Sequence, residues 1–314
     1  MFADLKRQYR ASLKSADTEE GIDLAFYRPI GFAWAYLFRR LGVTPNAVTV
    51  ASIFLGVAAG VLFYPEGLWL NCIGMALLVW ANSFDSADGQ LARLTGNYSK
   101  TGRILDGLSG DLWFATIYVA ICLREVHTSP YFAAHAWLIW FVAALAGGCH
   151  ARQAALADYY RQFHLYIVNG TAGSELDRAA DLAAQLRATP WKGNFWRKTV
   201  LFVYKNYTDN QELLTPAMQH LRGEMTARWG HARPPRPFLD DFRAASRPLM
   251  KYTNFLTFNW RSITLFASLL AGRPWLYFAV ELTVFNAVTA YMWWRHESIC
   301  RRFTIALRSG RYDD

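Results

Sequence analysis

The sequence predicts an all-α membrane protein with six transmembrane helices, an N-terminal interfacial helix and a helical cytoplasmic insertion. Hydrophobic residues make up 53% of the chain and gather in long, nearly uncharged blocks rather than in the stripes typical of soluble helices. With flanking turns, each block approaches the roughly 20 residues that a helix needs to cross a hydrocarbon layer of about 30 Å. The predicted spans cover residues 47–64, 68–84, 112–123, 133–149, 255–271 and 275–294.

The N-terminal part, residues 1–45, precedes the first span. Its residues 29–41 carry an apolar, aromatic face and end in two arginines, which is typical of a helix that lies against lipid headgroups. The alternative is a plain continuation of the first span, broken at Gly42 and Pro45.

Residues 46–150 hold the first four spans. The first span contains Gly56 and Gly60 on one helix face, a spacing that lets a neighbouring helix approach closely. Residues 254–296 hold the fifth and sixth spans, and residues 297–314 are expected to form a cytoplasmic tail.

Between the fourth and fifth spans, residues 151–253 are largely polar and predict a cytoplasmic helical insertion. Ser174 and Asp177 have the spacing of a capping box before an Ala- and Leu-rich helix that ends near Arg187. Residues 195–207 mix aromatic and aliphatic side chains with Lys and Arg, as a surface-bound helix does.

The net charge of +9 is explained by membrane topology. Lys and Arg are concentrated before the first span, between the second and third spans and after the sixth, whereas the opposite connections carry only Arg124 and Arg273. Because positive residues stay on the cytoplasmic side, both termini and the site described below are expected in the cytoplasm, with the chain in a bacterial inner membrane. A nucleic-acid partner is not expected, since it would require a concentrated basic face on a soluble domain.

The cysteines do not indicate a disulfide framework or a zinc site. They lie in or beside the predicted spans without paired spacing, and are expected to act as small packing residues. These residues are Cys72, Cys122, Cys149 and Cys300.

Carboxylates concentrate at the cytoplasmic ends of the second and third spans. Asp85, Asp88, Gly89, Ala92 and Arg93 recur at helical spacing and share one helix face. Carboxylates one turn apart can bind one divalent metal ion, the small residues let a phosphorylated ligand approach the backbone, and the arginine can pair with phosphate. Solvated helix-end acids are the alternative, but they do not explain such clustering at membrane depth, where charge is costly.

The helix that leads into the third span carries two further acids, Asp106 and Asp111, which can face the first helix and complete an oxygen-rich site. Hard carboxylate oxygens favour Mg²⁺, Mn²⁺ or Ca²⁺ over zinc or copper.

This segment resembles the signature of the CDP-alcohol phosphatidyltransferase family, D-x2-D-G-x2-A-R-x8-G-x3-D-x3-D. The residues that match in identity and spacing are Asp85, Asp88, Gly89, Ala92, Arg93, Gly102 and Asp106. The resemblance extends over about residues 30–125 and includes the Thr44-Pro45-Asn46 entry to the first span. It points to relatives of the phosphatidylinositol phosphate synthases or related phospholipid synthases.

One position departs from the signature. The last aspartate of the family falls at Gly110, and Asp111 follows one residue later. Five residues on a regular helix rotate a side chain by about 140° from Asp106, whereas four residues rotate it by about 40°. We expect a one-residue bulge to let Asp111 replace the missing carboxylate.

The resemblance implies that two divalent ions, Mg²⁺ or Mn²⁺, are held by Asp85, Asp88, Asp106 and Asp111. It further implies that Gly89, Ala92 and Arg93 line the pocket for a CDP-linked donor, with Asn46 and Thr49 as weaker candidates. Asp111 is then the catalytic base that takes the proton of the acceptor hydroxyl, and CMP is released. A homodimer embedded among membrane lipids is the assembly that the resemblance implies.

The acceptor is expected to be an alcohol such as inositol phosphate or glycerol phosphate. Arg152 and Arg161 follow the fourth span and can bind its phosphate, although ordinary positive-inside flanking also explains them. Arg261 lies within the fifth span and needs a partner, and Glu281 lies in the sixth.

Other functions remain open at this point. Within the enzyme class, CDP-choline or CDP-ethanolamine can be the donor and a lipid alcohol the acceptor. An ion-coupled transporter explains the carboxylates but not the Gly, Ala and Arg beside them. A binding protein descended from the enzyme, disabled by Gly110, predicts nucleotide binding without turnover.

Overall fold

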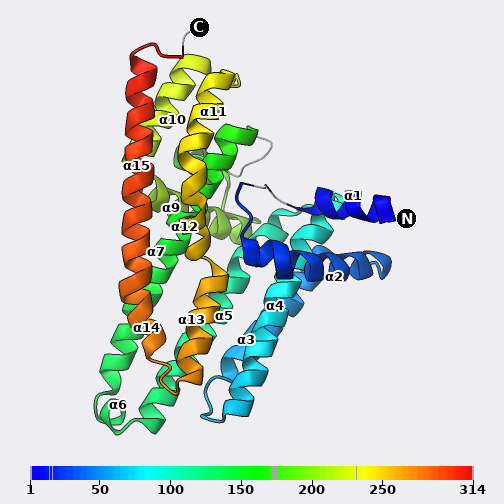
Figure 1. The fold of residues 1–314 in the computed structure, drawn as a ribbon, viewed down its shortest axis with the longest axis vertical. Helices are drawn as coiled ribbons and strands as arrows, with labels where there is room; N and C mark the ends of the chain where they lie inside the picture. The colour runs from blue at the N-terminus through cyan, green and yellow to red at the C-terminus, as the bar shows by residue number, and fades with distance from the viewer. Residues whose placement is uncertain (1, 14, 16, 171–175, 231, 313–314) are drawn as a thin grey trace. The chain divides into compact units, whose positions relative to one another are not determined.

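The computed structural model describes the chain except residues 1, 14, 16, 171–175, 231 and 313–314, and the described residues form helices without strands (Figure 1). Two compact units divide the chain. The first unit comprises Met1–Cys149 and Phe258–Thr283, and the second comprises His150–Thr257 and Val284–Asp314. The all-α prediction is therefore confirmed for the described residues.

The first unit carries the carboxylates and the other residues predicted to bind the metal ions and the donor. Its helices are α1 (Phe2–Ser12), η1 (Asp23–Tyr27), α2 (Arg28–Arg40), α3 (Pro45–Val61), α4 (Leu68–Thr95), α5 (Lys100–Thr128), α6 (Pro130–Ala134), α13 (Phe258–Leu270) and α14 (Leu276–Val280). The helix α7 (Ala136–Asn169) starts in the first unit and continues into the second, while η4 (Glu281–Phe285) crosses the later boundary.

Each predicted span overlaps at least one helix, but six membrane-spanning helices are not confirmed. Among the described residues, the stretch Leu105–Thr128 is the one that is both long and apolar enough to cross a bilayer, and Pro45–Val61 is a shorter apolar helix. The predicted fifth span is interrupted between α12 (Met250–Phe255) and α13, and a π-helical turn, η4, interrupts the sixth.

Close helix approach in the first unit depends on the glycines of α3. A Cβ atom added to Gly56 would lie 2.1 Å from the Trp113 ring on α5. One added to Gly60 would lie 2.9 Å from the Thr116 side chain. The predicted role of this glycine pair in helix approach is confirmed, and it fixes α5 beside α3.

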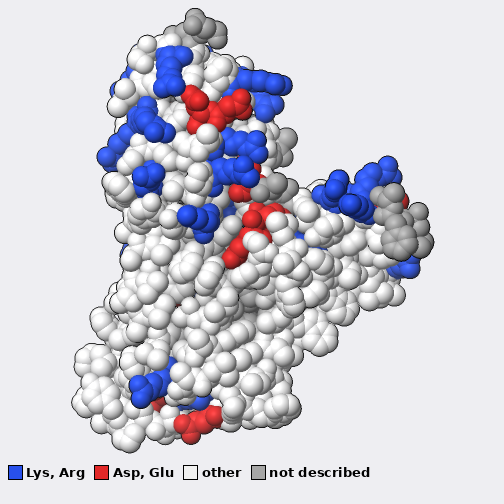
Figure 2. Space-filling model, viewed as in Figure 1, with Lys and Arg blue, Asp and Glu red and all other residues white. Residues whose placement is uncertain are grey.

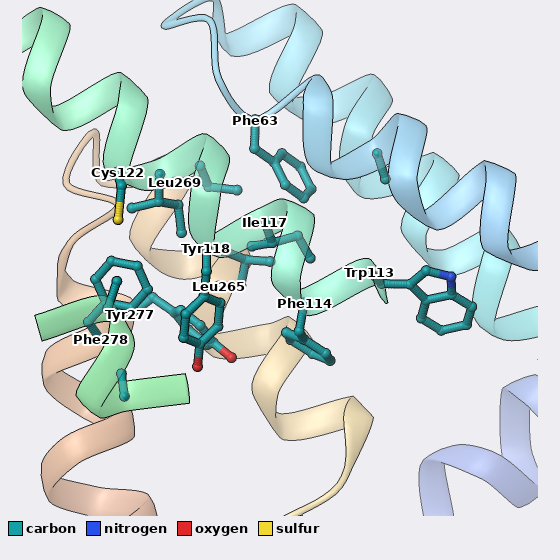
Figure 3. Packing of buried hydrophobic residues seen from close by; sticks show 14 of the residues in the cluster. Phe63, Trp113, Phe114, Ile117, Tyr118, Cys122, Leu265, Leu269, Tyr277 and Phe278 are labelled. Carbon is teal, nitrogen blue, oxygen red and sulfur yellow. The ribbon is translucent and has the colours of Figure 1, made fainter. Parts of the chain in front are cut away.

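The core of the first unit is built by α3, α4, α5, α7, α13 and α14. Figure 3 shows the Tyr118 ring of α5 beside Tyr277 and Phe278, and Trp113 turned toward α3. The Tyr118 and Phe278 ring centroids lie 4.9 Å apart. On the face shown in Figure 2, the surface over α13 and the lower part of α4 is almost free of charge, as a lipid-facing surface would be.

An ion pair is buried in this unit between α13 and η4. Arg261 and Glu281 bond through Nη1 and Oε1, and their side chains are 1% and 0% exposed. Burying a single charge at this depth would cost free energy, and each side chain offsets part of that cost for the other by neutralising its charge. The partner that Arg261 was expected to need is therefore Glu281.

The predicted interfacial helix is α2, and it packs across the end of α4 (Figure 1). Ala35 packs with Val48, Ala87 and Leu91 in a small cluster of their own. Gly31 approaches α4 so closely that an added Cβ would lie 2.6 Å from Gln90 Oε1. One face of α2 thus covers the helix that carries most of the motif.

The second unit is helical, as predicted for the insertion, and it includes the C-terminal helix. Its helices, besides the end of α7, are α8 (Ala179–Ala188), α9 (Phe195–Leu214), α10 (Pro216–Trp229), α11 (Arg236–Ser246), η3 (Arg247–Leu249), α12 and α15 (Asn286–Arg308). Lys and Arg gather over α10, α11 and α15 on the face shown in Figure 2.

Side chains from other helices cap two helices of this unit. Glu212 on α9 accepts from the Ala179 amide at the start of α8, at 3.1 Å. Glu297 on α15 accepts from the Ala217 amide at the start of α10, at 2.6 Å. A carboxylate at a helix N-terminus is favourable because it faces unpaired amides and the positive end of the helix dipole. Ser174, predicted to cap α8, lies outside the described residues.

Candidate metal and nucleotide site

Local capping sets where the three site helices begin and end. The Thr44 side chain accepts from the Ala47 amide, and Pro45 occupies the first turn of α3. Ser99 accepts from the Gly102 amide at 2.8 Å and starts α5. Gly96 ends α4 in the left-handed region, at φ +67°, which glycine adopts without strain. The motif therefore lies at the end of α4 and the start of α5.

Three carboxylates meet between these helices. Asp85 and Asp88 on α4 and Asp106 on α5 place one ligand oxygen each within 4.8 Å of the others. Asp88 is buried, Asp85 is half-buried and Asp106 is exposed, so the group opens to one side. No other such group of His, Cys, Asp or Glu occurs in the described part of the chain. An all-oxygen donor set of this kind fits Mg²⁺ or Mn²⁺.

Hydroxyl groups from other helices orient two of these carboxylates. Thr49 on α3 donates a hydrogen bond to Asp88 Oδ2. Ser109 on α5 donates to Asp85 Oδ1 at 3.0 Å and shares its hydroxyl with the Asp106 carbonyl at 2.7 Å. Such partners fix a ligand carboxylate before any ion arrives.

Asp111 does not join this group. The expected bulge is absent, because α5 is a regular α-helix from Lys100 to Thr128. Five residues therefore rotate Asp111 by about 140° from Asp106, and its side chain is exposed. The prediction of Asp111 as a fourth metal ligand at this group thus lacks the geometry that it needed.

Arg93 lies against the N-terminal segment of the chain. Its Nε donates to the Ser12 carbonyl at 2.6 Å, and its Nη2 is buried without a hydrogen-bond partner in the described structure. Burial, followed by the Arg28 cation, lowers the pKa of Arg93. A bound anion would stabilise this buried guanidinium, because it would pair with the charge and accept a hydrogen bond from Nη2.

The glycines of the motif keep this region open. A Cβ atom on Gly89 would lie 3.5 Å from Arg93 Nη1 and would narrow the space beside the cation. Gly102 lies so close to Asn46 that an added Cβ would be 2.5 Å from Asn46 Oδ1, which also accepts from Ser99 at 3.2 Å. Asn46 therefore joins α3 to the start of α5, and Ala92 stays half-buried on the motif face.

The two predicted acceptor arginines belong to the second unit. Arg152 is exposed on α7, and Arg161 donates to Asn254 Oδ1 at 3.1 Å. They are nine residues apart on a continuous α-helix, a rotation of about 180°, so they project from opposite faces. The structure does not bring the two together on one phosphate.

Sequence reasoning missed several groups that support the motif. Ser109 had a signal, since it lies three residues after Asp106 and so shares its helix face. Two hydrogen bonds link α4 to the N-terminal segment. Gln90 on α4 donates to Ser12 Oγ at 3.2 Å, and Arg28 donates to Ser86 Oγ on α4 at 3.2 Å. Contacts between segments so far apart in the sequence had no local signal.

Comparison with known proteins agrees with this geometry. The family described as CDP-alcohol phosphatidyltransferase matches residues 42–162, which contain the whole carboxylate group. An archaetidylinositol phosphate synthase of Pyrococcus horikoshii is 39% identical over 83 residues, 26% of this chain and 43% of the relative. Another, of Aeropyrum pernix, is 33% identical over 91 residues, 27% of this chain and 45% of the relative.

The matched chain thus spans less than half the length of these curated relatives. The match nevertheless covers α3, α4 and α5 together with every matching signature residue. Residues 42–162 are therefore similar to the CDP-alcohol phosphatidyltransferase family, and the similarity includes all the residues that meet at the carboxylate group.

Proposed function

We propose that this protein transfers a phosphatidyl or phosphoalcohol group from a CDP-linked donor to an alcohol and releases CMP. The observation that carries the proposal is the meeting of Asp85, Asp88 and Asp106, with ligand oxygens within 4.8 Å of one another, inside the domain that defines the family.

The three carboxylates are the residues that would hold the divalent ions, either Mg²⁺ or Mn²⁺. Bound there, the ions would supply charge neutralisation for the donor pyrophosphate. Thr49 and Ser109 hold the carboxylates in place.

Arg93 and the small residues beside it are the proposed donor pocket. Arg93 Nη2 has no hydrogen-bond partner among the described residues, which supports a phosphate contact, because a buried guanidinium gains most from a charge-assisted bond. Gly89 and Ala92 leave room for the nucleotide, and Asn46 is proposed as a further contact of the donor. The hydroxyl of Thr49 is engaged by Asp88, which favours a positioning role over nucleotide contact.

The acceptor oxygen attacks the donor phosphorus, the bond to CMP breaks, and the hydroxyl proton passes to a carboxylate. Asp111 is our candidate for this base, since its exposed side chain need not bind metal to accept a proton. The two archaetidylinositol phosphate synthases among the relatives support inositol phosphate as the acceptor. Arg152 and Arg161 are proposed acceptor contacts, each to be varied singly.

The family implies an integral membrane enzyme, and we propose six spans with both termini and the site in the cytoplasm. The uncharged surface over α13 supports this topology. A homodimer is part of the same proposal.

The test is CMP release by the purified protein with Mg²⁺. CDP-diacylglycerol is offered with inositol phosphate, glycerol phosphate or inositol, and CDP-choline is offered with diacylglycerol. Asp88→Asn and Asp111→Asn are assayed beside the unaltered protein.

Release that needs one acceptor and is lost in Asp88→Asn supports the transfer reaction and names its substrates. Loss in Asp111→Asn as well supports Asp111 as the base, whereas release that survives this change moves the base elsewhere. Tight CDP binding without release from any donor would instead indicate a disabled enzyme. Ion flux into proteoliposomes without CMP release would indicate a transporter.

A further inference from the structure

The N-terminal half of α9 in the second unit presents an apolar stripe that no other part of the described chain covers. Phe195, Trp196, Phe202 and Val203 are 60%, 78%, 51% and 61% exposed. Their positions, i, i+1, i+7 and i+8, place them on one helix face. Trp191 in the preceding turn is 54% exposed and extends the stripe.

The stripe is not needed to hold α9 in its unit. The later half of α9 holds the helix in its unit: Gln211 donates to the Ala155 carbonyl at 2.9 Å, and Glu212 caps α8. Trp293 Nε1 donates to the Leu214 carbonyl at 2.7 Å and fixes the end of the helix. Five large apolar side chains are therefore exposed without a role in this unit, which marks an interaction surface.

The charged residues within the segment that carries the stripe are all basic, although Lys205 at its end pairs with Asp209. Residues 191–205 contain Lys192, Arg197, Lys198 and Lys205 but no acid. Lys198 Nζ lies 5.0 Å from the centre of the Trp191 ring, so this cation borders the apolar surface directly. Tryptophan next to lysine suits the boundary between headgroups and acyl chains.

We infer that this stripe lies in the headgroup layer of a membrane and binds anionic lipid. A second copy of the chain fits poorly, because a symmetric contact would place this basic patch against itself. Anionic headgroups complement the cations while the acyl region accepts the aromatic rings. The inference is independent of the transfer reaction and gives the insertion a second attachment to the bilayer.

The experiment places a fluorophore on the stripe of the full-length protein. Trp196→Cys is labelled in a background with Cys72→Ser and Cys149→Ser, since Cys122 and Cys300 are buried. The control is His220→Cys on the exposed face of α10. Both proteins are reconstituted into vesicles of phosphatidylcholine, with or without 30% phosphatidylglycerol, that contain lipids brominated near the headgroup.

We expect several-fold stronger quenching at position 196 than at position 220, and a further increase with phosphatidylglycerol that high salt reverses. Replacing Lys192, Arg197 and Lys198 by Gln should abolish the response to phosphatidylglycerol. A matching thermal transition for all labelled proteins verifies folding.

Equal quenching at the two positions overturns the inference. So does protection of position 196 that depends on protein concentration and is accompanied by crosslinking between copies, which would identify a dimer contact. Strong quenching at position 196 that ignores phosphatidylglycerol, salt and the three substitutions overturns the anionic-lipid part.

Discussion

At the scale of single residues, the site depends on how its carboxylates are held. Asp88 is buried and receives the Thr49 hydroxyl from α3, while Asp85 receives Ser109 from α5. Each of these two carboxylates on α4 is therefore oriented by a neighbouring helix rather than by its own. An isolated helix with the same motif would lack both contacts.

The first prediction concerns Thr49→Val, which keeps the side-chain volume and removes the hydroxyl. Asp88 then loses a partner, and the Mg²⁺ concentration for half-maximal CMP release should rise about 10–100-fold. Mn²⁺ binding measured by electron paramagnetic resonance should weaken in parallel without substrate present.

Thr116→Val is the matched control, because the Thr116 hydroxyl bonds the Leu112 carbonyl of its own helix. Its metal requirement should stay unchanged. An unchanged requirement in Thr49→Val as well would refute the positioning role.

The grouping of Asp85, Asp88 and Asp106 could be predicted because helical periodicity and span order place them together. The position of Asp111 could not, because the prediction needed a bulge and α5 remains regular. Gly107 and Gly110 make a distortion of the helix easier, but a bulge still costs free energy that no contact in the sequence pattern is seen to offset.

At the scale of helices, the approach of α3 to α5 is set by the absence of side chains. Gly56→Ala would place a methyl group inside contact distance of the Trp113 ring. Over-packing of this kind costs about 1–3 kcal/mol, so the thermal transition in detergent should fall by several degrees.

Gly148→Ala on α7 serves as control, since an added Cβ meets nothing within 4 Å there and alanine favours helix. Its transition should stay level or rise. Trp113→Leu combined with Gly56→Ala should be less destabilising than the sum of the two changes if the ring is the obstacle.

A further prediction concerns the buried pair between α13 and η4. Arg261→Met leaves the Glu281 carboxylate buried without its cation and should cost about 3–5 kcal/mol of stability. The double variant with Glu281→Met should recover most of that loss, as measured by unfolding in detergent. Arg273→Met, at an exposed position, should change little; an equal loss in this control would argue against a pair-specific effect.

The helices themselves were largely predictable, since apolar blocks and the Thr44-Pro45 start gave α3, α4 and α5 their places. The break before α13 and the π-turn at Glu281 were not. Both depend on how the helices pack against one another, which cannot be predicted from the composition of a single apolar block.

At the scale of the whole molecule, the helical insertion and the C-terminal helix form one unit with its own buried polar interior. His296 stacks on Tyr160 at 4.2 Å between ring centres, and Glu297 accepts from the Tyr160 hydroxyl at 3.1 Å. The sequence predicted helices here, but not that residues 284–314 would join them, because the contacts are distant along the chain.

This interior predicts acid sensitivity. Burial, reinforced by nearby His164, lowers the pKa of His296 to about 3, whereas an unfolded histidine titrates near 6.5. Below pH 6.5 His296 binds a proton in the unfolded chain but stays neutral in the folded chain. The free energy of unfolding therefore falls as the pH falls from 6.5 toward 3. From pH 7.5 to 5.5 the expected loss is about 1.4 kcal/mol.

The measurement compares thermal transitions at these two pH values for His296→Gln and the exposed-site control His220→Gln. The His296 variant should lose less stability on acidification than the unaltered protein, whatever its absolute stability. The His220 variant should behave like the unaltered protein. The same acid response in all three proteins would remove His296 as its source.

The hydrogen bond from Arg93 to the Ser12 carbonyl has a consequence for how this protein is studied. A main-chain oxygen is present whatever residue occupies position 12, so a mutational scan of the N-terminal segment would pass over this contact. Deletion through residue 12 would remove it, so assays on such a truncated protein would report on an altered environment of Arg93 rather than the native one.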